Sequence, residues 1–176
     1  MNILPFVLLL AVPVFANGQD APHCPMMQDK ADPHAAAVDA RGDHAMGFSH
    51  AKSAHHFQLS PDGGAIEVGA KDEKDEGTRD EIRMHLAHIA QMFSAGNFQV
   101  PMFIHDTVPP GVAVMEAKKE AISYKYEETA KGGRIRITTT DADALKAVHD
   151  FLSFQIDDHR TGDPKAISPI KGSDQK

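Results

Sequence analysis

The chain has few cysteines and few aromatic residues for its length. Its 176 residues include one cysteine, two tyrosines and no tryptophan, and aromatic residues make up 6% of the total. A single cysteine cannot form an intramolecular disulfide, so the fold has to be held together by its apolar core. The roughly 160 residues after the N-terminal apolar segment are enough for one domain with a sizeable core.

Several functional motifs are also missing. The formal net charge of −7 argues against a nucleic-acid partner, which requires a basic face. The sequence contains no glycine-rich nucleotide-binding loop, no Ser/His/Asp pattern and no His-Glu-x-x-His motif. A Cys-x-x-Cys-His motif for covalent haem is absent as well, which leaves non-covalent haem open. The sequence does not decide whether the protein is an enzyme.

The N-terminus carries the one long apolar run. Residues 3–15 have no charged side chain, and Val14-Phe15-Ala16 has the small-x-small pattern of a cleavage site. A secretion signal needs roughly 7–15 apolar residues, whereas a membrane-spanning helix needs about 20. Residues 1–16 are therefore predicted to be a cleavable secretion signal, with an uncleaved anchor as the alternative. We expect a periplasmic or secreted protein without stable membrane insertion after cleavage.

The remaining chain divides by composition into three stretches. Residues 17–47 are poor in large apolar residues and rich in Ala, Asp, Pro and His, which predicts a flexible arm. Residues 48–161 contain the regular apolar patterns of a single α+β domain. Residues 162–176 resemble the arm in composition and are predicted to be a disordered tail.

A strand–turn–strand–helix order begins the predicted domain. Alternating apolar residues indicate strands at 55–59 and 65–70, joined by a Ser-Pro-Asp-Gly-Gly turn. A helix is expected from residue 78 to about residue 95. Thr78 and Glu81 have the spacing of a capping box at its start.

The same order of elements recurs in the second half. Strands are expected at 121–129 and 134–140, followed by a helix that begins after Asp141 or Asp143 and ends at about residue 159. Each predicted helix has an apolar stripe to bury. The expected fold is a four-stranded antiparallel sheet with two helices on one face, possibly a strand–strand–helix duplication.

Histidine is unusually abundant, with eleven residues in the chain. On the first predicted helix, His85 and His88 are three residues apart and can point the same way. Two imidazoles at that spacing can supply two ligands to one zinc or copper ion. Glu81 and Met92 lie on the same flank, where Glu81 could bind the ion or orient an imidazole, and the Met92 thioether suits copper(I). The alternative is that both histidines are rim residues bonded to backbone or solvent.

Three more histidines lie on other predicted elements. His55 and His56 project to opposite faces of the first strand. Because His55 shares a face with Phe57, it is expected to point toward the helices, where it could complete a three-histidine site or make a structural hydrogen bond. His105 lies in a Pro-rich connection that is expected to pack on the domain, and it could serve as a ligand or a general base.

The second helix and the arm supply the remaining candidates. His149 on the apolar stripe is more typical of a satisfied core residue than of a ligand, and His159 is expected to interact with the negative helix C-terminus. In the arm, the sequence His23-Cys24-Pro25-Met26-Met27 combines imidazole, thiol and thioethers, which select copper(I). The alternative for this segment is a leader that binds metal only nonspecifically.

Four stretches of the sequence resemble those of a known group of proteins. They are MGFSHAKSAHHF, TRDEIRMHLAHIAQMFSAGNF, PMFIHDTVPPG and FLSFQIDDHRTGD. Each is similar to sequences in a family of small exported, histidine-rich bacterial proteins. The resemblance covers residues 46–163, leaves the Cys24 segment outside, and implies no activity.

These patterns predict an exported protein that binds copper or zinc. The candidate ligands are His55, His85, His88 and His105, with Glu81, Met92, His149 and Cys24 as secondary candidates. A small metal-dependent enzyme and a module that binds haem or another small ligand are the alternatives. The expected partner is a metal ion or a small ligand, and the oligomeric state is not indicated.

Overall fold

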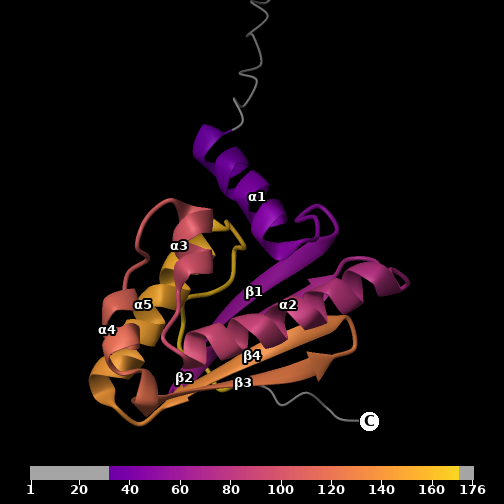
Figure 1. Cartoon of the computed structure of the whole chain (residues 1–176). Helices are drawn as coiled ribbons and strands as arrows, with labels where there is room; N and C mark the ends of the chain where they lie inside the picture. The colour runs from indigo at the N-terminus through magenta and orange to yellow at the C-terminus, as the bar shows by residue number, and fades with distance from the viewer. Residues whose placement is uncertain (1–31, 171–176) are drawn as a thin grey trace, which may run out of the picture. The chain divides into compact units, whose positions relative to one another are not determined.

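The computed structural model describes residues 32–170, drawn in colour in Figure 1. The predicted signal, Cys24 and residues 171–176 lie outside the described residues. The described elements are, in chain order, α1 (Pro33–Met46), β1 (Ser53–Ser60), β2 (Gly63–Ala70), α2 (Glu76–Ser94), α3 (Gln99–His105), α4 (Val112–Ala117), the 3-10 helix η1 (Lys119–Ala121), β3 (Ile122–Thr129), β4 (Gly132–Thr139) and α5 (Ala142–Asp158).

The four strands form one antiparallel sheet in the order β1-β2-β4-β3. Both hairpins close through two-residue turns, since Ser60 pairs with Gly63 and Thr129 pairs with Gly132. The two hairpins join at the central strands, where Ile66 lies opposite Ile135. The predicted α+β fold with a four-stranded antiparallel sheet is confirmed. The described residues form five α-helices rather than the two that were expected.

Helices α2 and α5 pack on the same face of the sheet (Figure 1). Each helix crosses to the hairpin that it does not follow in sequence: α2 packs mainly against β3 and β4, and α5 mainly against β1 and β2. The apolar stripes of both helices are buried in the core between the two layers. These residues are Ile82, Leu86, Ile89 and Phe93 on α2 and Val148, Phe151, Leu152 and Ile156 on α5.

Residues 33–46 were assigned to a flexible arm, and the structure corrects this because they form helix α1. Asp32 caps the helix by accepting a hydrogen bond from the His34 amide at 3.0 Å, and Gly47 ends it in the left-handed conformation. On α1, Arg41 donates from Nε to the carbonyl oxygen of Ile104 on α3 at 2.7 Å. Alanine-rich composition, terminal caps and packing on α3 therefore order a segment that has few large apolar side chains.

The start of α2 also differs from its prediction. Asp75, not Thr78, caps the helix: one Asp75 carboxylate oxygen accepts from the Thr78 amide at 3.0 Å and the other accepts from the Thr78 hydroxyl at 2.9 Å. Thr78 is therefore already inside the first turn, and Glu81 is exposed. The helix begins earlier than predicted because an aspartate three residues upstream offers a charged cap.

The connection from α2 to β3 folds into short helices that pack on α5. Gly111 is the N-cap residue of α4 and has φ 86°. A Cβ at this position would lie 2.1 Å from the carbonyl oxygen of Ala147. Only glycine permits so close an approach of the two backbones. The connection thereby brings α3, and with it His105, beside the C-terminal half of α5 (Figure 1).

The segment after α5 follows the outer strand β1. Asp163 accepts a hydrogen bond from the Phe57 amide at 2.9 Å, and the Ser168 amide donates to the carbonyl oxygen of Leu59 at 3.0 Å. These bonds hold residues 163–168 along the edge of β1. The structure therefore corrects the prediction of a disordered tail for this part of residues 162–176. Among residues 32–170, none of the helices combines the length and the apolar character required to cross a bilayer.

Candidate functional site

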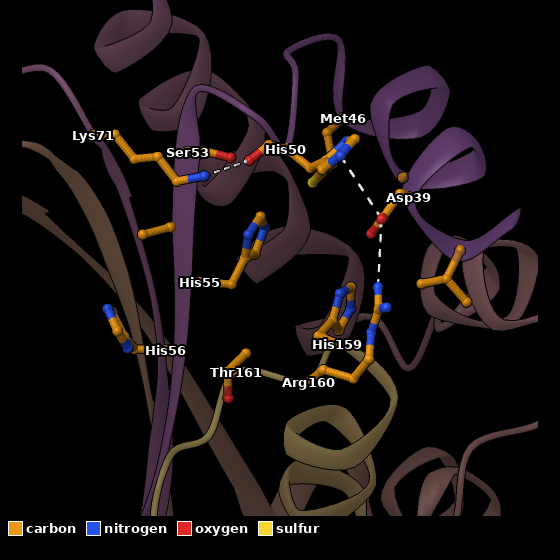
Figure 2. A pocket seen from close by; sticks show the side chains of 13 residues that line it. Asp39, Met46, His50, Ser53, His55, His56, Lys71, His159, Arg160 and Thr161 are labelled. Atoms are coloured by element: carbon orange, nitrogen blue, oxygen red, sulfur yellow. Dashed lines mark hydrogen bonds and ion pairs between the residues drawn. The ribbon is translucent and has the colours of Figure 1, made fainter. Parts of the chain in front are cut away.

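An open cavity of about 540 Å³ lies between α1, β1 and the end of α5 (Figure 2). A smaller and more apolar chamber of about 70 Å³ extends inward, between α2, α3 and α5. Met46, His55 and His159 line both spaces, so we call these three residues the partition. His85 and His105 line only the inner chamber.

Each member of the partition comes from a different element. His55 lies on β1 opposite Val68, on the face of the sheet that the helices cover. His159 is the C-cap residue of α5, and Met46 is the last residue of α1. Two imidazoles and a thioether therefore meet at one cavity (Figure 2). They come from β1, from the end of α5 and from the end of α1.

The imidazole rings lie close to one another and to phenylalanines. The rings of His55 and His159 are parallel within 4°, with centroids 5.6 Å apart, and the rings of His105 and His159 meet edge-on at 4.9 Å. The Phe48 ring lies near two of these histidines, with centroid distances of 6.5 Å to His55 and 5.7 Å to His85. The rings are half-buried and have aromatic neighbours.

Three of these imidazoles are held in the neutral form. Burial lowers the pKa of His55 to about 4, with a further contribution from the neighbouring His85. Burial likewise lowers the pKa of His85 to about 4 and that of His159 to about 3, the latter with help from His55 and His105. At neutral pH each ring therefore carries one N–H donor and one lone pair, and lacks charge.

The same three rings have no hydrogen-bond partner in the protein within residues 32–170. His105 and His149 differ from them in this respect. In His105 both ring nitrogens make hydrogen bonds. Nδ1 lies 2.5 Å from a carboxylate oxygen of Asp158, and Nε2 lies 3.0 Å from the side-chain oxygen Oε1 of Gln155. His149 Nε2 lies 2.9 Å from the carbonyl oxygen of Ser60. The three rings are half-buried and line the open cavity or the inner chamber, so their nitrogens are available to a ligand there, and this makes His55, His85 and His159 the candidate ligand-binding groups.

Asp158 joins three helices through its contacts with histidines. One carboxylate oxygen contacts His105 on α3, and the other lies 2.8 Å from Nε2 of His34 on α1. Burial opposes ionisation of Asp158, but the hydrogen bonds with His34 and His105 outweigh it and lower its pKa. Asp158 on α5 thus fixes the orientation of His105 beside the inner chamber.

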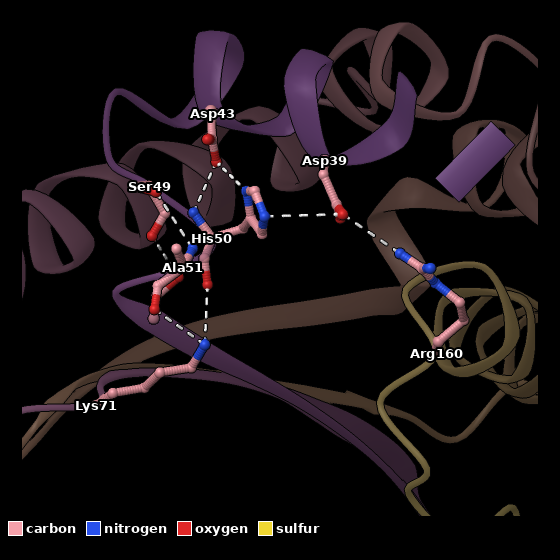
Figure 3. Close-up of polar contacts among 8 residues, drawn as sticks. Asp39, Asp43, Ser49, His50, Ala51, Lys71 and Arg160 are labelled. Atoms are coloured by element: carbon pink, nitrogen blue, oxygen red, sulfur yellow. Dashed lines mark hydrogen bonds and ion pairs between the residues drawn. The ribbon is translucent and has the colours of Figure 1, made fainter. Parts of the chain in front are cut away.

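The rim of the open cavity carries charged groups (Figure 3). Asp39 on α1 lies 3.4 Å from Arg160 Nη2 and 3.7 Å from His50 Nε2. His50 also contacts Asp43 through Nδ1 at 2.9 Å. Lys71 donates from Nζ to the carbonyl oxygens of His50 and Ala51, at 3.2 and 3.1 Å. These contacts tie α1 and the following turn to the sheet and to the end of α5.

Of the residues predicted as principal metal ligands, the structure brings three to one region. His55 stands in the partition, and His85 and His105 line the inner chamber. His55 points toward the helices, as its alternation with Phe57 indicates. Because His105 uses both nitrogens, it has no free lone pair for an ion in this conformation.

The other predicted ligands lie apart from this region. His88 and Glu81 are exposed on α2 and line neither space, and Met92 packs against the core. His149 makes the structural hydrogen bond expected of a core histidine. Cys24 lies outside the described residues.

Sequence reasoning missed two members of the partition. His159 was interpreted as a partner of the helix C-terminus, although it follows Gln155 and Ile156 by four and three residues and so continues their inward face. That spacing was a usable signal. Met46 fell within the predicted arm, and only the presence of α1 makes its position meaningful.

In the conformation described for residues 32–170, no set of three or more His, Cys, Asp or Glu side chains is arranged to hold a metal ion. The partition offers a different set, two imidazoles and one thioether. No protein family, curated protein or solved structure matches the chain in our comparisons. The resemblance to exported bacterial proteins stays a prediction, and functional inference rests on the site.

Proposed function

We propose that the protein binds one copper ion at the partition, through His55, His159 and the thioether of Met46. The observation that carries this proposal is a pair of neutral, unpartnered imidazoles whose rings face the same cavity. A metal ion requires neutral imidazole with an available lone pair, and lowered pKa values keep these rings in that form over a wide pH range. His85, beside the inner chamber, is the reserve ligand.

Ring positions support two imidazoles on one ion. Two imidazoles bound to a tetrahedral ion at metal–nitrogen distances of about 2.0–2.1 Å have ring centroids roughly 5 Å apart. The centroids of His55 and His159 are 5.6 Å apart. The two rings are stacked with nearly parallel planes, so both side chains would have to rotate to direct their in-plane lone pairs to one point. Participation of His85 as a third nitrogen ligand would require a larger rotation, because no three-histidine set is preformed in residues 32–170.

The chemistry of the partition favours copper over zinc. Thioether sulfur is a soft ligand that selects copper(I), whereas zinc sites in proteins use thiolate, imidazole and carboxylate. The partition contains a thioether and imidazoles, and the carboxylate that lines the same cavity, Asp39, lies 3.4 Å from Arg160 and 3.7 Å from His50. Aromatic neighbours and burial also favour an ion of low charge.

Export is part of the proposal. Residues 1–16 have the pattern of a secretion signal, and an exported protein meets copper outside the metal buffering of the cytosol. We propose that the chain acts in the periplasm or outside the cell. Fusion of residues 1–30 to a reporter that folds only after export would test this: reporter activity is expected, and its absence would contradict export.

The test of copper binding is an anaerobic competition titration with a chromogenic copper(I) chelator, using the chain after signal removal with Cys24→Ser, Met26→Leu and Met27→Leu, so that the soft ligands of the arm do not contribute. We expect one copper per chain. His55→Gln and His159→Gln should each weaken binding by at least about 100-fold, more than the 10–100-fold typical of outer-shell partners. His88→Gln is the matched control, because His88 is exposed on α2 and should leave the affinity unchanged.

Two results would contradict the proposal. One is stoichiometric copper binding that survives the double variant His55→Gln/His159→Gln. The other is a loss of affinity in His88→Gln equal to that in the partition variants. The same titration with zinc measures the preference, and tighter binding of zinc than of copper would overturn the assignment of the ion.

A further inference from the structure

We propose that the open cavity is a second binding site, which takes a small organic dicarboxylate between Lys71 and Arg160. Lys71 and Arg160 are not members of the partition, but the three partition residues line the same cavity, so the inference is tested on the copper-free chain. Both line the cavity of about 540 Å³, a volume suited to a small organic molecule. Figure 2 shows Lys71 and Arg160 on opposite sides of His55 and His159.

Lys71 carries a charge that the protein does not balance locally. Its Nζ donates to two backbone carbonyl oxygens, of His50 and Ala51, and within residues 32–170 no carboxylate lies at ion-pair distance. By contrast, Lys118 lies within 3.0 Å of both Asp141 and Asp143. The carbonyl oxygens fix the Lys71 ammonium at the cavity rim, and one N–H remains for a ligand.

Arg160 lies on the other side of these histidines, and its backbone has an unfavourable conformation. Its φ is 53°, in the left-handed region, where a residue other than glycine costs on the order of 1–2 kcal/mol. Its guanidinium has five donors, and its one ion pair in the described chain joins Nη2 to Asp39 at 3.4 Å. The remaining donors form a fork that matches a carboxylate.

The cavity lining also contains the apolar residues Val38 and Met46, which suit a short hydrocarbon body. The cavity lining carries two positive charges and one negative charge, with histidines counted as neutral, so its net charge is +1 in a chain of net charge −7. An anion is therefore drawn to this cavity rather than to the rest of the surface.

The experiment is isothermal titration of the copper-free chain, after signal removal, with succinate and with butyrate as a monocarboxylate of similar length. Succinate should bind at least about 10-fold more tightly than butyrate, because it engages both cations. Lys71→Gln should weaken succinate binding at least about 10-fold. Arg160→Asn should do the same, and asparagine is chosen because it tolerates a positive φ.

Lys52→Gln is the matched control, because this substitution removes the same positive charge outside the cavity. Lys52 pairs with Asp75. It should leave succinate affinity within about twofold of the unaltered chain. The proposal is overturned if succinate does not bind, if butyrate binds equally well, or if Lys52→Gln weakens binding as much as Lys71→Gln. Because copper is absent throughout, none of these outcomes depends on whether the partition binds metal.

Discussion

Replacing His159 with phenylalanine should stabilise the copper-free protein. The His159 ring packs against the rings of His55, Phe57 and His105 and has no protein hydrogen-bond partner within residues 32–170. The ring is half-buried, so its nitrogens lose part of their hydration without gaining a protein partner, and an apolar ring of similar shape avoids that cost, which is about 1–2 kcal/mol here. The adjoining chamber of about 70 Å³ accommodates the slightly larger ring.

The magnitude depends on pH. His159 has a pKa of about 3 in the folded chain, against 6.5 for an unperturbed histidine, so the unfolded state binds a proton that the folded state does not. A lowered pKa of a base makes stability fall as pH decreases below 6.5, by about 1.4 kcal/mol for each pH unit. Between pH 6.5 and 5 the loss is about 2 kcal/mol from this residue alone. The phenylalanine variant does not suffer it.

Urea unfolding of the copper-free chain at pH 7 and pH 5 measures both effects. His159→Phe should raise the free energy of unfolding by about 1–2 kcal/mol at pH 7, and by about 3–4 kcal/mol at pH 5. At pH 7 the thermal midpoint should rise by roughly 2–4 °C for each kcal/mol. An advantage that is the same at both pH values would refute the reasoning, because it would show that His159 titrates alike in the folded and unfolded chain.

Two further substitutions test how the site is held in place. Asp158→Asn removes the charged partner of both His34 and His105, and should destabilise the protein by about 1–3 kcal/mol and increase amide hydrogen exchange in α1; unchanged exchange in α1 would show that this carboxylate does not hold the helix. Gly111→Ala places a Cβ 2.1 Å from the Ala147 carbonyl oxygen at φ 86°, and should cost more than about 1 kcal/mol in urea unfolding; a neutral effect would contradict the close approach of α4 to α5.

The sheet and the two long helices were predictable because their signals are local. The Pro61-Asp62 turn and the alternation of Phe57 and Leu59 define the first hairpin, and the stripe that includes Ile82 and Leu86 defines the buried face of α2. The direction of His55 follows from the same alternation. These features depend only on residues that are close together in the sequence.

The partition was not predictable in the same way, because its members meet only through tertiary packing. Met46 depends on α1, a helix whose apolar residues are small and whose order comes from caps and from contacts with α3. His159 reaches the cavity because α5 crosses onto β1 and β2. His88, which spacing paired with His85, is exposed, whereas His85 is half-buried and lines the inner chamber.

The most direct test of the central claim is X-ray absorption spectroscopy at the copper edge of the protein loaded with one copper(I) per chain. Two imidazole nitrogens and one sulfur are predicted in the coordination shell. Met46→Leu preserves the packing of the end of α1 and should remove the sulfur signal. A shell without sulfur in the unaltered protein, or a sulfur signal that persists in Met46→Leu, would contradict the assignment of copper to His55, His159 and Met46.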